Sequence, residues 1–64
     1  MGNDMTVYVY TKGAQTRMTA DKAYGDELVS LGFTRRRHLA PKDAQMFCEG
    51  WEAAWKDGVD DPYQ

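Results

Sequence analysis

The stretch from Pro41 to Asp57 constrains this chain most, because its apolar residues recur at the spacing of an amphipathic helix. The residues at this spacing are Ala44, Phe47, Cys48, Trp51, Ala54 and Trp55. At roughly 100° per residue they fall within an arc of about 120°, the width of a stripe that packs on a core. Pro41 suits a first helical position, and Gly58 suits the position just past the end. We therefore expect one helix here, with the rest of the chain folded against its apolar face.

The length of 64 residues allows a single domain, residues 1–64, and limits what can stabilise it. A chain of this size buries only about 60% of the surface that its unfolded form exposes. Cys48 is the only cysteine, which excludes an internal disulfide, and with His38 as the only histidine it cannot complete a zinc site. We expect no metal and no cofactor. Two sources of stability remain: a core dense in aromatic residues, or the association of two copies of the chain.

The charge and hydropathy of the chain narrow its class. No apolar run approaches the roughly 20 residues that a membrane span needs, and no secretory signal is evident, so we expect a soluble, cytoplasmic protein without membrane contact. The net charge is −2, but residues 1–42 carry seven basic and four acidic side chains, whereas residues 43–64 carry one and six. A net acidic chain is not a natural general binder of nucleic acid.

The N-terminal part of the chain predicts a β-hairpin. Residues from Met5 to Thr11 alternate in the manner of a strand, Lys12-Gly13 marks a turn, and Gln15 to Met18 returns as a second strand. The alternation places Val7 and Val9 on one face and Thr6, Tyr8 and Tyr10 on the other. We expect the face that carries the tyrosines to be the outer one.

A second helix is expected from Ala20 to Leu31. Thr19 is a suitable N-cap, and Gly32 followed by Phe33 matches a glycine just past a helix end with an apolar residue after it. The inner stripe of this helix would consist of Ala20, Ala23, Tyr24, Leu28 and Leu31. Glu27 falls within the stripe, either as a carboxylate at its edge paired with an arginine or as a buried acid that serves a site.

Phe33 to Ala40 should be extended, because the proline that follows disfavours helix before it. Neither face of this segment is apolar, so it is either an edge strand or a loop laid across the fold. Residues 1–4 and 59–64 should be mobile ends. The expected fold class is α+β, a small sheet made of the hairpin and the edge segment, with two helices packed on one face.

Two exposed groups of residues are candidates for binding a partner. Arg35, Arg36 and Arg37 precede His38, and beside Tyr8 and Tyr10 they could hold single-stranded nucleic acid, or they could simply form a solubilising edge. Because side chains alternate along an extended segment, at most two of the arginines should face one partner. The second group is Met46 with the small residues Gly50 and Ala53 on the back of the last helix, a docking surface, a homodimer surface or an incidental one.

Catalysis is not expected. Ser30, the only serine, falls inside a predicted helix, and no nucleophile, phosphate-loop or metalloprotease motif surrounds it or His38. Cys48 lies on the apolar stripe, where a thiol is normally inert. The remaining acidic set, Asp43, Glu49, Glu52, Asp57, Asp60 and Asp61, is either a solvated face or a surface for a basic groove.

In size, acidity and aromatic content the chain resembles the small accessory proteins with which bacteriophages bind and block host enzymes. That resemblance implies a non-enzymatic binding module that docks on a host or cellular protein as an inhibitor or adaptor. The expected contact residues are Tyr8, Tyr10, Arg35, Arg36, Arg37 and Met46. The alternatives are a nucleic-acid-binding protein that uses the arginine stretch and the tyrosines, and a structural homodimer formed through the last helix.

Overall fold

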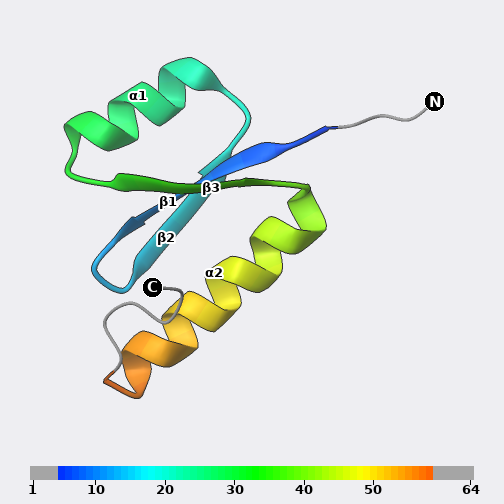
Figure 1. The fold of residues 1–64 in the computed structure, drawn as a ribbon. Coiled ribbons are helices and arrows are strands. Elements are labelled where there is room, and N and C mark those ends of the chain that lie inside the picture. The colour runs from blue at the N-terminus through cyan, green and yellow to red at the C-terminus, as the bar shows by residue number, and fades with distance from the viewer. Residues whose placement is uncertain (1–4, 59–64) are drawn as a thin grey trace.

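The computed structural model describes residues 5–58, which form a three-stranded antiparallel sheet and two helices (Figure 1). The elements are β1 (Val7–Lys12), β2 (Gln15–Thr19), α1 (Lys22–Ser30), β3 (Thr34–Leu39) and α2 (Pro41–Lys56). The strand order β2-β1-β3 makes β1 the central strand. The predicted α+β class and the N-terminal hairpin are confirmed, and the segment before α2 is an edge strand rather than a loop. The expectation of mobile ends concerns 1–4 and 59–64, which lie outside the described residues.

The two helices lie on opposite faces of the sheet (Figure 1), so the prediction that both pack on one face is wrong. Successive residues of β1 point to opposite faces. Val9 is completely buried in a cluster with residues of α2, whereas Tyr10, 3% exposed, packs with Leu28 of α1. When a helix covers each face of a sheet, its central strand has no solvent-exposed face. The alternation of aliphatic and aromatic residues along β1 therefore does not distinguish a buried face from an exposed one.

Helix α2 forms the larger of the two cores with the sheet. Its buried residues are Ala44, Phe47, Cys48 and Trp51, and Trp55 packs beside them half-buried. The Trp51 Nε1–H donates to the Gly13 carbonyl oxygen at 2.8 Å, which ties the helix to the β1–β2 turn. The helix begins at Pro41 as expected, and Gly58 follows its last turn at a φ of +88° that favours glycine.

Helix α1 is shorter than expected, beginning at Lys22 with Asp21 as its N-cap. The Asp21 side chain accepts from the backbone N–H of Ala23 at 3.0 Å. The prediction of Thr19 as the N-cap is wrong, because Thr19 is the last residue of β2 and its Oγ1 instead accepts from the Asp21 N–H. The predicted C-terminus is confirmed, since Gly32 follows the C-cap at a φ of +100°.

The side of α1 that faces the sheet also differs from the predicted stripe. Gly25 and Leu28 are its buried residues, while Tyr24 is 40% and Leu31 is 56% exposed. Gly25 lies against the Tyr10 ring, and this close approach sets the rotation of the helix about its axis. Glu27 is exposed, which excludes the interpretation of a buried acid.

Candidate functional site

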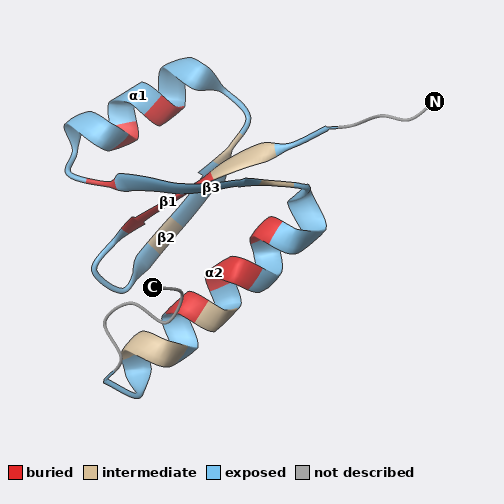
Figure 2. Ribbon diagram, viewed as in Figure 1, coloured by how far each residue is buried: buried red, intermediate tan, exposed pale blue. Residues whose placement is uncertain are grey.

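Strand β3 is exposed along most of its length at the edge of the sheet (Figure 2). The five residues from Thr34 to His38 are all exposed, and only Leu39 is partly covered. Three of these residues are arginines. We call Arg35, Arg36 and Arg37 the arginine edge.

A β-bulge sets the direction of the arginines. In the pairing of β3 with β1, Val9 lies opposite Arg37 and Tyr10 lies opposite Arg35, so that Arg36 is the extra residue. A bulge of this kind disrupts strict alternation and re-aims the side chains beside it. The arginines therefore do not follow the alternation expected of a regular strand.

Two of the arginines lie over the core on the side of α2. The Arg36 guanidinium carbon is 5.0 Å from the centroid of the Trp51 ring, and that of Arg37 is 5.8 Å from the centroid of Phe47. Arg36 Nε also donates to the hydroxyl oxygen of the buried Thr11 at 3.0 Å. These two side chains thus shield the aromatic core and present charge to solvent at once.

The third arginine belongs to a group on the side of α1. The Arg35 guanidinium carbon lies 5.0 Å from the centroid of the Tyr8 ring. The Tyr8 and His38 rings are stacked, with centroids 4.0 Å apart and planes inclined by 10°. His38 Nε2 lies 2.6 Å from the Thr6 hydroxyl oxygen. All three guanidinium groups of the arginine edge are therefore held against aromatic rings.

The structure brings together only some of the expected contact residues. Tyr8 is half-buried and joins Arg35, as the sequence suggested, but the expectation that Tyr10 lies on an outer face is wrong, since α1 covers it. Met46 is 62% exposed on α2.

The contacts of Arg36, Arg37 and His38 are not evident from the sequence. The spacing of Phe47 and Trp51 predicts that they lie in the core, and nothing in the sequence signals that Arg37 and Arg36 cover them. The partner of His38 follows from the register, in which it lies directly opposite Tyr8. The sequence does not specify the register between β1 and β3, and without that register the pairing of His38 with Tyr8 is not predictable.

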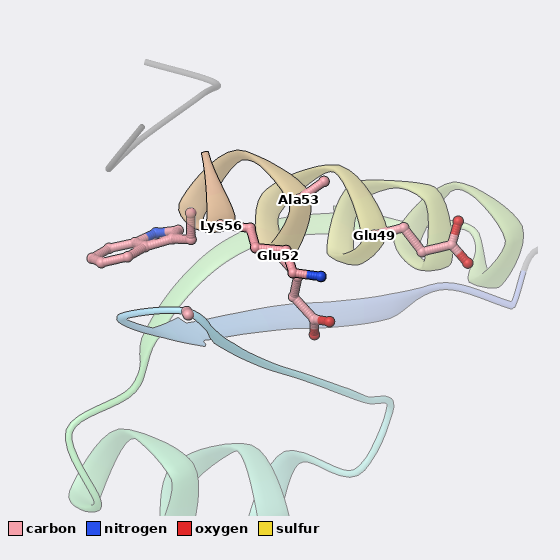
Figure 3. Close-up of a pocket in the computed structure, with 6 residues that line it drawn as sticks. Glu49, Glu52, Ala53 and Lys56 are labelled. Atoms are coloured by element: carbon pink, nitrogen blue, oxygen red, sulfur yellow. The ribbon is translucent and has the colours of Figure 1, made fainter. Parts of the chain in front are cut away.

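A groove of about 540 Å³ lies between the β1–β2 turn and the last turns of α2 (Figure 3). It is lined by Ala14, Glu49, Glu52, Ala53, Trp55 and Lys56. Glu52 accepts a hydrogen bond from the Thr16 hydroxyl, and Gln45 donates to Glu49. The carboxylates at this groove thus have partners on the protein itself.

The described residues offer little for metal or thiol chemistry. Residues 5–58 contain no group of three or more His, Cys, Asp or Glu side chains that could hold a metal ion. Burial raises the pKa of the Cys48 thiol, and the hydrogen bond with Thr16 opposes that rise. A buried thiol of raised pKa is a poor nucleophile.

Within residues 5–58 no helix is long and apolar enough to cross a membrane. Comparison with protein-family models, with curated proteins and with solved structures finds no match to this chain.

Proposed function

We propose that this chain is a small non-enzymatic binding module that docks on another protein through the arginine edge, as an inhibitor or adaptor of the kind that bacteriophages direct at host enzymes. The observation that carries the proposal is the state of the three arginines, which are exposed and yet held over the rings of Tyr8, Trp51 and Phe47. The partner surface that suits them is acidic.

Held arginines favour binding because less side-chain freedom remains to be lost in the complex. A guanidinium can contact a ring through its face while N–H donors in its plane bind carboxylate oxygens. Arginine is also among the residues that contribute most at protein interfaces. In this proposal Met46, which is 62% exposed on α2, adds an apolar contact.

Nucleic-acid binding is the second candidate, and the geometry favours it less. Bases bound without sequence preference stack on exposed aromatic faces. Tyr10 is buried under α1, and the Tyr8 ring is already stacked on His38 and contacted by Arg35. With a net charge of −2, the chain also lacks the overall positive field that attracts phosphate backbones.

A capture experiment with matched variants tests the proposal. The tagged protein is incubated with cell lysate, with and without nuclease, beside the double variant Arg35→Gln/Arg37→Gln and the control Lys22→Gln/Lys56→Gln. Both doubles remove two positive charges and leave polar side chains, and the control positions are exposed and lie outside β3. Circular dichroism verifies that each variant is folded.

We expect the wild-type chain and the lysine control to capture one protein in near-stoichiometric amount after nuclease treatment. The arginine variant should capture at least about tenfold less of that protein. Equal capture by both doubles would exclude the arginine edge as the interface. Recovery that disappears with nuclease would replace protein docking by nucleic-acid binding.

A further inference from the structure

Strand β3 combines basic side chains with a position at the edge of the sheet that residues 5–58 form. Among residues 5–58 it pairs with β1 on one side, and the strand order β2-β1-β3 leaves no strand on the other. An edge strand presents backbone N–H and C=O groups that an extended chain can pair with. Strand β3 is six residues long, from Thr34 to Leu39.

The charge of this edge selects among extended partners. Four consecutive residues, Arg35 to His38, are basic, and β3 contains no acidic residue. A second copy that paired edge to edge would set arginine against arginine, and like charges directly opposite are destabilising. The basic edge therefore disfavours self-association and favours a strand that carries carboxylates.

Basic groups lie on both faces of the edge because of the bulge. Arg35 contacts Tyr8 on the side of α1, whereas Arg36 and Arg37 contact rings on the side of α2. An added strand would also project its side chains alternately to the two faces. Carboxylates at successive positions of such a strand would each meet a guanidinium, which a flat surface with charge on one face would not allow.

We propose that β3 receives an extended acidic segment of the partner protein as a fourth strand of the sheet. The inference rests on the proposed docking function and adds the class of partner and the way in which it binds. Backbone hydrogen bonds supply part of the affinity, and the arginine edge selects acidic sequences. Because the bulge interrupts the regular ladder at Arg36, pairing occurs in the regular parts of β3 on either side of it.

Fluorescence anisotropy and amide hydrogen exchange test this mode of binding with defined probes. The first probe is a labelled peptide as long as β3 in which pairs of adjacent glutamates alternate with pairs of threonines, so that carboxylates project to both faces of the added strand. Its controls are the same peptide with N-methyl groups on alternate residues, which keeps the charge and removes strand pairing, and a peptide with lysine in place of glutamate. A labelled oligodeoxythymidylate probes nucleic-acid binding.

We expect the glutamate peptide to bind and to slow hydrogen exchange of backbone amides between Thr34 and Leu39. The N-methylated peptide, the lysine peptide and the variant Arg35→Gln/Arg37→Gln should each weaken binding at least about tenfold.

Equal binding of the N-methylated and unmodified peptides would overturn strand addition and leave docking by charge intact. Absence of peptide binding would also overturn it, whereas capture of a protein through the arginine edge would still support the proposed function. Tighter binding of the oligonucleotide than of the glutamate peptide would overturn both.

Discussion

The backbone of Gly25 in α1 lies directly against the hydroxyl end of Tyr10 in β1. A Cβ added at Gly25 would be 2.1 Å from the Tyr10 hydroxyl oxygen and 2.9 Å from the ring carbon that bears it. Tyr10 is 3% exposed, so its ring has little space to move aside. This contact explains why the shorter helix packs on β1 through a glycine, with Leu28 buried beside it while Tyr24 and Val29 remain exposed.

We expect Gly25→Ala to destabilise the fold by about 1–3 kcal/mol, because overpacking a filled core outweighs the better helix propensity of alanine. Urea denaturation measures the change. Adding Tyr10→Phe removes the closest atom and should restore part of the loss, while Ala23→Gly controls for propensity at an exposed position of the same helix. A Gly25→Ala protein as stable as the wild type would show that the helix can shift without cost.

Trp51→Phe should reduce the free energy of unfolding by about 2 kcal/mol, because it leaves space in the core and removes the hydrogen bond to the Gly13 carbonyl. Trp55→Phe is the matched control. The Trp55 Nε1 is buried and has no hydrogen-bond partner among the described residues, so its removal should cost less than about 1 kcal/mol. Denaturation of both variants provides the comparison. A larger loss for Trp55 than for Trp51 would contradict this account of the α2 core.

The raised pKa of Cys48 predicts a loss of stability at alkaline pH. Burial holds the thiol proton in the folded chain to a higher pH than in the unfolded chain. The resulting stabilisation is complete below the unfolded pKa of about 8.5 and is lost as the pH rises through the folded pKa.

Urea unfolding of the wild type and of Cys48→Ala, measured at increasing pH, isolates this contribution from that of other groups. The difference in the free energy of unfolding between the two proteins should narrow as the pH rises. Parallel stability curves would show that the Cys48 thiol titrates alike in the folded and unfolded chains.

Met46 tests the homodimer hypothesis for the outer side of α2. Because its side chain is 62% exposed, Met46→Asp should change the stability of the folded chain by no more than about 0.5 kcal/mol. In a dimer formed through this surface, the new carboxylate would be buried against the second copy, so sedimentation should show dissociation to monomers. Gln45→Asp, at the preceding exposed position, serves as the control. A Met46→Asp protein that remains dimeric would remove this surface from consideration.

The candidate site was partly predictable. The run of arginines and the edge position of the segment that holds them follow from the sequence, because no core could accept three charged residues in a row. The contacts of the individual arginines do not follow from the sequence. They depend on the bulge at Arg36 and on the rings of Phe47 and Trp51, which the packing of α2 on the sheet brings beneath the edge.

Local signals in the sequence determined where α2 begins and where both helices end. Pro41, Gly32 and Gly58 act through their own backbone preferences, and the spacing of the α2 stripe is a property of that segment alone. Only the tertiary structure decided that the helices cover opposite faces and that Tyr10 is buried. The physical reason is that alternation along a strand distinguishes two faces, whereas burial depends on what other elements place over each of them.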